Sequence, residues 1–239
     1  MVKTEPGMRV LVTGAAGGIG RATCEALVEL KAHVIGVDLP GTGADVEADL
    51  ADDTAAANAV AEAVERLGGL DALVGVAGKV DTLHRADRFP VDAFRADVDA
   101  NLSAQFFVAQ AAFPHLRGHG TIVFFSSLAA RDGLPGQAAY AAAKAGVLGL
   151  TRTLAGEWAD AGIRVNAIMP GLVATPKVLA LPPETTQRML ANVPLGRLAT
   201  LDELAGTVIY LLSPASGYMT GQALRLDGGA GLMRSGLHR

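Results

Sequence analysis

The sequence feature that most constrains the fold is a glycine-rich turn between an apolar run and an amphipathic segment. The apolar run RVLVTG begins at Arg9, and the turn TGAAGGIG follows it from Thr13 to Gly20. From Gly18 onward, apolar side chains recur at the spacing of one helix face. An apolar strand that passes through a tight turn into a helix is the first unit of a parallel α/β sheet.

The rest of the chain alternates short apolar runs with longer helical patterns. Further strands are predicted at residues 33–38, 46–50, 70–78, 121–127, 163–171 and 223–229, of which 46–50 is the weakest. Helices are predicted at residues 18–32, 52–69, 97–118, 138–162 and 201–214. This alternation predicts an α/β fold with right-handed crossovers and a doubly wound, mainly parallel sheet of seven strands. We expect a single domain over residues 1–239, with the proline-rich segment 172–200 as a substrate lid.

Composition and charge exclude several classes of protein. The net charge of −4 gives no basic surface for nucleic acid, and no apolar run approaches the roughly 18 residues of a membrane span. Cys24 is the sole cysteine, so no internal disulfide forms. The sequence opens without the apolar region of a secretion signal. We therefore expect a cytoplasmic protein with neither nucleic acid nor membrane as a partner.

The histidines do not suggest a metal site. They are His33, His84, His115, His119 and His238. His115 and His119 are four residues apart, a spacing that suits a metal on a helix. Gly118 and Gly120 indicate that the helix ends there, however, and no third ligand stands nearby. His84 follows the fourth strand, where we expect a solvated loop histidine, with contact to a substrate as the alternative. We predict no metal.

Glycines in the first turn suit the binding of a dinucleotide. Gly14 permits the tight turn, Gly18 lets the backbone approach a pyrophosphate, and Gly20 lets the helix pack closely on the strand. The first turn of the helix also offers free N–H groups and a positive dipole end to phosphate oxygens. A plain tight turn between a strand and a helix is the alternative interpretation.

The acid at the end of the second strand predicts which dinucleotide binds. Asp38 stands about 20 residues past the glycines, where a carboxylate accepts hydrogen bonds from the adenosine ribose hydroxyls. It would also repel a 2′-phosphate. Neither Leu39 nor Gly17, which occupy nearby positions, is basic, and Arg21 begins the first helix. We predict NAD rather than NADP; the alternative for Asp38 is a strand-end turn residue.

The segment YAAAK places Tyr140 and Lys144 on one face of a predicted helix, one turn apart. A free tyrosine has a pKa of about 10, too high for a base at neutral pH. A nearby lysine ammonium and a positive nicotinamide ring would both stabilise the phenolate. We predict that Tyr140 is the acid/base of a redox reaction and that Lys144 lowers its pKa. A surface pair on a helix is the alternative.

Three further positions complete the predicted site. Ser127 ends a strand, where its hydroxyl can hydrogen-bond the substrate oxygen, with Ser126 as the alternative. Asn101 falls inside a predicted helix, where asparagine is unfavourable, and is expected to hold a helix distortion and a water. An exposed helical asparagine is the alternative. Pro170–Gly171 ends the next strand and would let the backbone approach the nicotinamide.

These motifs together resemble the short-chain dehydrogenase/reductase family, through its TGxxxGxG and YxxxK patterns. The residues that carry the resemblance are Thr13–Gly20, Asn101, Ser127, Tyr140, Lys144 and Pro170–Gly171. The resemblance extends from Arg9 to Gly229 and implies a Rossmann domain, an NAD-preferring oxidoreductase and assembly into homotetramers or homodimers. It also implies that Lys144 binds the nicotinamide ribose and that the water at Asn101 relays protons from Lys144 to solvent.

The resemblance further implies a set of cofactor contacts. Asp49 would contact the adenine, and Thr175 the carboxamide or a phosphate, with an ordinary loop threonine as the alternative. The residues expected to bind the dinucleotide are Gly14, Gly17, Gly18, Ile19, Gly20, Asp38, Asp49, Leu50, Ala77, Gly78, Tyr140, Lys144, Pro170, Gly171, Val173 and Thr175. One segment departs from the family: GVAG, Gly75 to Gly78, stands where two asparagines commonly precede Ala-Gly and usually help to hold the central sheet.

The predicted activity is interconversion of a secondary alcohol and a ketone by hydride transfer. Apolar residues of the lid, with no cluster of bases, favour an uncharged apolar substrate, cyclic and aromatic ones included. They are Val178, Leu179, Leu181, Met189 and Leu190, with Leu128 and Leu134 outside the lid. A 3-oxoacyl carrier-protein reductase is one alternative. A dinucleotide-sensing module without turnover is another, and a third is a lyase-type relative of the halohydrin-processing branch, which lacks the lysine and the dinucleotide turn.

Overall fold

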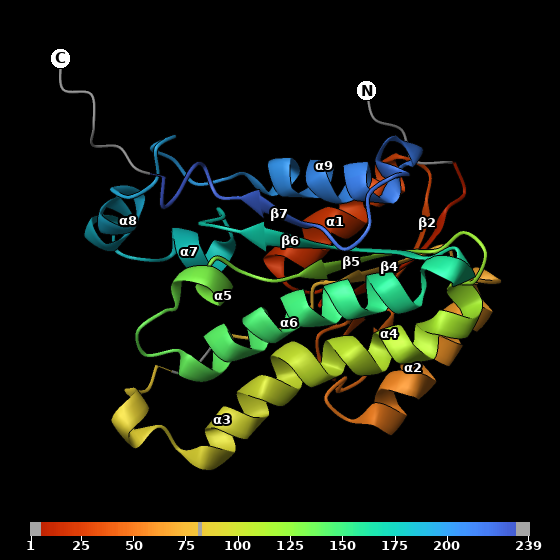
Figure 1. The fold of residues 1–239 in the computed structure, drawn as a ribbon, viewed down its shortest axis with the longest axis horizontal. Coiled ribbons are helices and arrows are strands. Elements are labelled where there is room, and N and C mark those ends of the chain that lie inside the picture. Colours follow the sequence, from red (N-terminus) through yellow and green to blue (C-terminus); the bar gives the residue numbers. More distant parts are fainter. Residues whose placement is uncertain (1–5, 81–82, 233–239) are drawn as a thin grey trace.

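A sheet of seven parallel strands forms the centre of the protein in the computed structural model, which describes residues 6–80 and 83–232 (Figure 1). The strands are β1 (Arg9–Thr13), β2 (His33–Asp38), β3 (Val46–Glu47), β4 (Ala72–Gly75), β5 (Thr121–Phe125), β6 (Arg164–Pro170) and β7 (Ala223–Leu226). Their order is β3-β2-β1-β4-β5-β6-β7, and every neighbouring pair is parallel. The prediction of a doubly wound, seven-stranded α/β sheet is confirmed.

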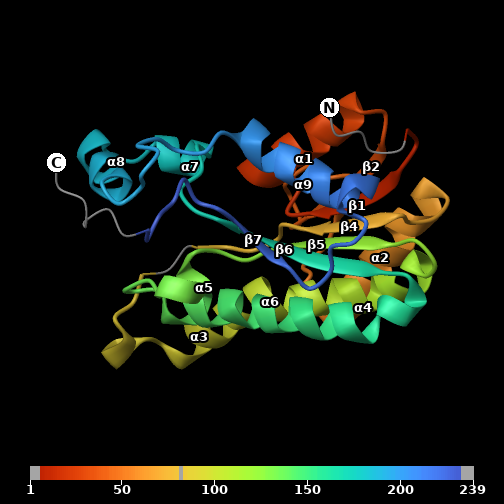
Figure 2. The same ribbon diagram turned by 45° about the horizontal axis from the view of Figure 1, so that its top comes forward.

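Helices cover both faces of the sheet, α1 and α9 on one face and α2, α4 and α6 on the other (Figure 2). Their bounds are α1 (Gly18–Glu29), α2 (Asp53–Leu67), α4 (Ala104–Leu116), α6 (Ala138–Glu157) and α9 (Leu201–Leu212). Within β1, Leu11 packs into the layer of α2, α4 and α6, whereas Val10 and Val12 pack into the layer of α1 and α9. Because successive side chains of a strand point to opposite faces, a sheet covered twice needs an unbroken apolar run in each central strand.

The helix expected at residues 97–118 is wrong as a single element. The structure instead has α3 (Val91–Val98), a π-helical turn at Asp99–Ser103, and then α4. In the π-turn, the N–H of Ala104 donates to the carbonyl of Asp99, five residues back rather than four. This turn contains Asn101, so the predicted helix distortion is present.

The segment 172–200 contains two short helices, α7 (Pro176–Leu179) and α8 (Pro183–Leu190). A β-bridge between Val173 and Ala199 joins the two ends of the segment. Both helices lie beyond the carboxyl ends of the strands, beside the short helix α5 (Ala129–Asp132) (Figures 1 and 2). The remaining short turns are 3₁₀ helices at Ala86–Arg88, Ala159–Ala161 and Pro214–Ser216. Among the helices of the described residues, none has the length and hydropathy that a membrane span requires.

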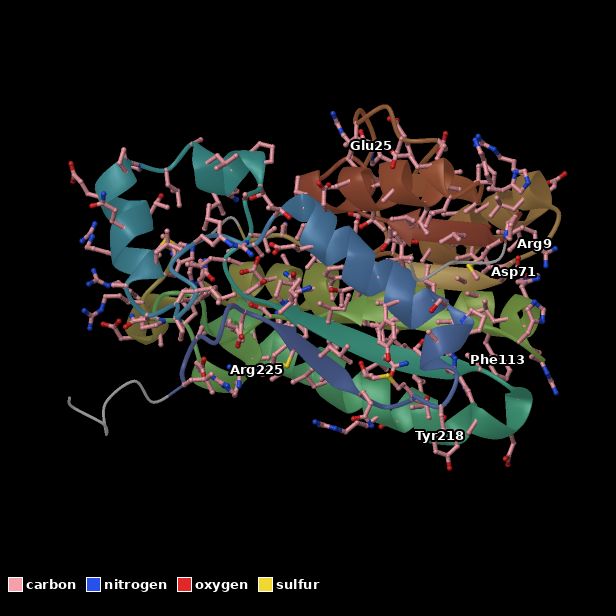
Figure 3. All side chains as sticks on the ribbon, turned by 90° about the horizontal axis from the view of Figure 1, so that it is seen from above. Arg9, Glu25, Asp71, Phe113, Tyr218 and Arg225 are labelled. Carbon is pink, nitrogen blue, oxygen red and sulfur yellow. The ribbon has the colours of Figure 1, made fainter. Side chains whose placement is uncertain are left out.

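Arg9, Asp71 and His119 join three strand starts at the amino ends of the sheet. Arg9 Nε and Nη2 donate to the Asp71 carboxylate at 2.9 and 2.6 Å, and the backbone N–H of Arg9 donates to it at 2.8 Å. His119 Nε2 lies 2.9 Å from Asp71 Oδ1. The side-chain hydrogen bonds from Arg9 hold the pKa of Asp71 well below its usual range. Figure 3 shows Arg9 and Asp71 side by side, at the end of the molecule opposite α7 and α8.

We expect Asp71→Asn to lower the free energy of unfolding at pH 7 by about 1–3 kcal/mol, because several hydrogen bonds to a charged acceptor are lost. A carboxyl whose pKa is lowered by folding stabilises the fold above its unfolded pKa of about 4, and this contribution fades as pH falls below that value. Urea unfolding at pH 7 and pH 3 should therefore show a difference between the two proteins that shrinks in acid. Asp87→Asn is the control, since Asp87 pairs with Arg85 at an exposed site. Equal losses in both variants would contradict the prediction.

Candidate active site

A cleft with a volume of about 700 Å³ opens at the carboxyl ends of β1, β2 and β4. Of the predicted cofactor residues, those that line it are Gly14, Gly17, Gly18, Ile19, Gly20, Asp38, Asp49, Leu50, Ala77, Gly78 and Thr175. The others, Tyr140, Lys144, Pro170, Gly171 and Val173, are outside this lining. The sheet order reverses between β1 and β4, which is the point where doubly wound sheets bind ligands.

The glycines of the first turn stand where side chains would collide with backbone. Gly14 has φ +68°, and a Cβ there would lie 2.8 Å from the backbone nitrogen of Ala77. A Cβ on Gly20 would collide with the carbonyl oxygen of Gly14. Gly18 faces the lid, because a Cβ on it would lie 2.9 Å from Cδ of Pro176. The turn thus packs against the loop after β4 on one side and against the lid on the other.

The carboxylate of Asp38 is oriented by two backbone N–H groups at the end of β2, where it lines the cleft. Ala16 donates to Oδ2 and Leu39 to Oδ1, each at 2.8 Å. The guanidinium of Arg21, which the sequence did not place, lies at the turn, where Nη2 donates to the carbonyl of Ala16 at 3.3 Å. An acid with both oxygens already fixed in direction is set to accept further hydrogen bonds from hydroxyl groups.

The loop after β2 contributes a wall of the cleft that sequence reasoning missed. Its backbone N–H groups at Gly41 and Gly43 donate to the Glu47 carboxylate at 2.9 and 2.7 Å. These bonds lower the pKa of Glu47, first through Gly41 and then through Gly43. Thr42, between the two glycines, lines the cleft next to Asp38 and Leu39. The two glycines around a threonine were the available indication of a tight loop, and the role of Glu47, four and six residues on, could not be read from this pattern.

Ser127, Tyr140 and Lys144 come together where β5 leads into α5 and α6 begins. Ser127 follows β5 and hydrogen-bonds Tyr140, while Nζ of Lys144 lies 5.8 Å from the centre of the Tyr140 ring. Nζ of Lys144 donates to the carbonyl of Phe125 at 3.0 Å. Ser126 is buried, and its hydroxyl donates to the carbonyl of Lys144 at 2.7 Å. The geometry therefore favours Ser127 over Ser126 as the serine beside the phenol.

Burial changes the pKa values of this pair in a direction that the sequence did not predict for Tyr140. Burial raises the pKa of the Tyr140 phenol, and the hydrogen bond with Ser127 offsets only part of the rise. Burial also lowers the pKa of the Lys144 ammonium, from 10.5 to about 8. Lys144 is not among the causes of this shift, and its ammonium hydrogen-bonds the carbonyl of Phe125. A lowering of the Tyr140 pKa by Lys144 and a nicotinamide ring stays a prediction.

Asn101 links the π-turn to the loop after β4. Its side chain is fully buried, and Nδ2 donates to the carbonyls of Asp97 and Lys79 at 2.9 and 3.0 Å. Oδ1 accepts from the N–H of Lys79 at 3.2 Å. A Cβ on Gly78 would lie 2.6 Å from Oδ1 of Asn101 and 3.0 Å from Nζ of Lys144. Gly78 therefore lies where the cleft meets the group of Asn101, Tyr140 and Lys144.

The end of β6 and the residues after it lie next to the segment that carries Ser127. The carbonyl of Pro170 accepts from the N–H of Leu128, next to Ser127, at 3.2 Å. Val173 is buried and bridged to Ala199. Thr175 caps α7 through its hydroxyl, which accepts from the N–H of Val178. Thr175 thus has a structural partner in addition to its place in the cleft lining.

The segment 172–200 reaches across the cleft through Lys177. Nζ of Lys177 donates to the carbonyl of Val80, after β4, at 2.8 Å. Both residues line the cleft. Of the apolar residues expected to line a substrate pocket, Leu134, Leu179 and Met189 are largely exposed. The local sequence pattern could not predict the contact of Lys177 with Val80, because the two residues are 97 positions apart.

Two arginines near the lid are paired with carboxylates. Arg131 in α5 donates through Nε and Nη2 to Asp132 at 2.5 and 2.8 Å. Arg225 in β7, labelled in Figure 3, donates through Nε to Asp227 at 2.8 Å. Within the described residues, His, Cys, Asp and Glu nowhere gather in a group that could hold a metal ion. His84 stacks edge-on against Phe89, and His238 lies outside the described residues.

Comparison with known proteins gives consistent matches over nearly the whole chain. A family model described as Enoyl-(Acyl carrier protein) reductase matches residues 14–231. A 3-oxoacyl-[acyl-carrier-protein] reductase FabG of Thermotoga maritima is 36% identical, over 92% of this chain and 96% of that protein. A cis-4-hydroxycyclohexanecarboxylate dehydrogenase of Sinomonas cyclohexanicum is also 36% identical, over 92% and 94%.

Solved structures agree with these matches. A short-chain dehydrogenase/reductase from Serratia marcescens superimposes with a TM-score of 0.87 at 31% identity, over 94% of this chain and 98% of that one. The fold of the chain accords with such relatives. The chain belongs to the short-chain dehydrogenase/reductase family of oxidoreductases.

Proposed function

We propose that the protein is an NAD(H)-dependent oxidoreductase that interconverts a secondary alcohol and a ketone. The observation that carries the proposal is the convergence of Ser127, Tyr140, Lys144 and Asn101 beside the cleft at Gly78. The residues fit a dinucleotide, since a glycine turn opens α1, an oriented carboxylate ends β2, and the cleft joins them. A bound nicotinamide dinucleotide supplies or accepts the hydride.

Each residue of the group has a distinct part in the proposed proton transfer. The Ser127 hydroxyl donates a hydrogen bond to the substrate oxygen and stabilises the charge that develops there. Tyr140 gives that oxygen a proton in ketone reduction and takes one in alcohol oxidation. A phenol with a raised pKa keeps its proton at neutral pH, which suits the reducing direction. Lys144 would bind the nicotinamide ribose, and a water at Asn101 would relay protons to solvent.

The substrate class is supported by the charges around the site. Arg131 and Arg225 are paired with carboxylates, so neither presents an uncompensated positive charge to a substrate carboxylate or phosphate. We therefore propose an uncharged, apolar alcohol or ketone, cyclic and aromatic ones included. A 3-oxoacyl carrier-protein reductase is the second candidate, because the Thermotoga relative carries that name.

Other features of the proposal rest on the resemblance to the family. We propose one catalytic domain in a cytoplasmic enzyme, assembled as a homotetramer or homodimer through α4 and α6. Phe107 and Phe113 of α4 are only partly buried in the single chain, which leaves apolar surface for such contact. The mass of the protein in solution tests the assembly, and a monomer at micromolar concentration would contradict it.

A panel of ketones and alcohols assayed with NAD(H) and NADP(H) tests the reaction. We expect oxidation of reduced nicotinamide, followed by its near-ultraviolet absorbance, with apolar ketones and slower or no reaction with an acetoacetyl thioester. Tyr140→Phe should cost at least about 10²-fold in rate while dinucleotide binding persists, because the phenol oxygen carries the proton. Binding without turnover on any substrate would favour a sensing module. A tenth of the wild-type rate in Tyr140→Phe would remove Tyr140 from the mechanism.

Asp38 should set the choice of NAD over NADP. As a carboxylate it accepts hydrogen bonds from ribose hydroxyls and repels a 2′-phosphate, which together give roughly 10²-fold discrimination or more. We expect Asp38→Ala to weaken NAD use and relieve the penalty on NADP, and Asp38→Ala with Leu39→Arg to go further. The measurement is kcat/KM for both cofactors with one substrate. Asp49→Asn, also in the cleft lining, should affect both cofactors alike. An unchanged ratio in Asp38→Ala would exclude Asp38 as the selector.

Lys144 should make stability depend on pH in a defined window. Because burial lowers its pKa from 10.5 to about 8, folding expels a proton between those values, and the free energy of unfolding rises with pH there. The rise is on the order of 3 kcal/mol at most. Lys144→Met should lack it, whereas Lys79→Met, at an exposed position, should keep it. Cys24, whose pKa burial raises to about 11, contributes oppositely but cancels in the difference between proteins. Parallel pH profiles for wild type and Lys144→Met would refute the prediction.

A further inference from the structure

Gly75, the last residue of β4, lies against the side chain of Gln105 from α4. A Cβ on Gly75 would overlap Oε1 of Gln105 and would lie 3.2 Å from its Cδ. The same Cβ would lie 3.0 Å from Cδ1 of Phe124 in β5. Gln105 is 2% exposed, so its amide is a polar group inside the core. The amide of Gln105 thus occupies the space that a side chain at position 75 would fill.

The buried amide of Gln105 has a specific partner in the loop after β4. Nε2 donates to the carbonyl of Ala77 at 2.7 Å. Four residues earlier on the same helical segment, the amide of Asn101 donates to the carbonyl of Lys79 and accepts from its N–H. The side-chain amides of Gln105 and Asn101 therefore bind the backbone of Ala77 and of Lys79, which are two residues apart. The π-turn at Asp99–Ser103 contains the first of these amides and ends two residues before the second.

The held loop is also the floor of the cleft. Ala77 and Gly78 both line it. The N–H of Ala77 donates to Oγ1 of Thr13 at 3.2 Å, and Ala77 packs against Gly14 of the glycine-rich turn. Gly78 abuts Asn101 and Lys144. A movement of Ala77 by a few tenths of an ångström would therefore reach both the glycine-rich turn and the ammonium of Lys144.

We propose that Gln105 is a positioning residue, which uses the space left by Gly75 to fix the Ala77–Gly78 floor of the dinucleotide cleft and so sets cofactor affinity. Gln105 itself does not line the cleft. The inference rests on the proposed function, since it takes the ligand of the cleft to be a dinucleotide. It accounts for a glutamine buried in the core and for a glycine at the start of the segment GVAG, because the amide of Gln105 fills the space beside Gly75 and holds Ala77.

Gln105→Met tests the proposal, because methionine keeps the volume and removes the donor to Ala77. Titration of NADH, followed by the fluorescence of the bound cofactor, should show its Kd raised roughly fivefold to tenfold, as expected for one lost hydrogen bond. The kcat at saturating cofactor should stay within about twofold. Gln110→Met is the matched control, on the exposed face of the same helix. An unchanged Kd, or a loss confined to kcat, would overturn the proposal.

Gly75→Ala supplies a second, independent variant. Its methyl group would displace the Gln105 amide, so Gly75→Ala alone should raise the Kd for NADH about as much as Gln105→Met does. In a Gln105→Ala background the methyl group no longer meets the amide and is close only to the Phe124 ring, so Gly75→Ala should then cause little further rise. This non-additivity is expected of two residues that act through one contact. Fully additive effects would show that Gly75 and Gln105 act separately, against the proposal.

Hydrogen exchange of the loop gives a readout that needs no cofactor. The amides of Ala77 and Lys79 donate to Thr13 and Asn101, and they should exchange faster in Gln105→Met than in wild type or Gln110→Met. Wild type that binds neither NADH nor NADPH would refute the proposed function, yet faster exchange would still support Gln105 as the residue that holds the loop. Wild type that binds NADH, with the same Kd and the same exchange in Gln105→Met, would refute the positioning role alone.

Discussion

The contact between the turn after β1 and the loop after β4 is the constraint on which the rest of the site depends. Gly14 approaches Ala77 so closely that a single Cβ would lie 2.8 Å from the Ala77 nitrogen, and Thr13 accepts a hydrogen bond from that same nitrogen. The two segments flank the point where the order of a doubly wound sheet reverses. One side of the cleft is built from the ends of β1 and β2 and the other from the segment after β4, and the two sides meet at this contact.

Three buried polar side chains near Gly78 each form a hydrogen bond with a backbone carbonyl. Asn101 binds the backbone of Lys79, Gln105 that of Ala77, and Lys144 that of Phe125. Buried amides and ammonium groups without partners would each cost free energy that a hydrogen bond largely restores. The same bonds fix the loops that they satisfy. These hydrogen bonds allow the three polar side chains to be buried in an apolar core. They also fix the position of the backbone around Gly78.

Local patterns in the sequence were sufficient for most of the fold. The strand His33–Asp38 follows from a short apolar run, and the aspartate cap at Asp52 follows from capping rules that act over a few residues. The π-turn could be anticipated only as a distortion, because its shape depends on how Asn101 meets Lys79 across the chain. The contacts of Gln105 with Ala77 and of Lys177 with Val80 join segments 28 and 97 residues apart. Such pairs depend on tertiary packing, which overrides local preference.

The raised pKa of Tyr140 has a similar physical origin, because it depends on tertiary packing. A sequence gives the spacing of a tyrosine and a lysine, but burial and hydrogen-bond direction decide which charge state each prefers. Here burial disfavours both ions, since it raises the pKa of the phenol and lowers that of the ammonium. Both groups respond strongly to any charge placed beside them in a poorly solvated space, because the interaction is weakly screened there. At the opposite end of the strands, hydrogen bonds from Arg9 favour the charged carboxylate of Asp71. The two ends of the sheet thus differ: ion pairing stabilises charge at the amino ends, and burial disfavours it at Tyr140 and Lys144 beyond the carboxyl ends.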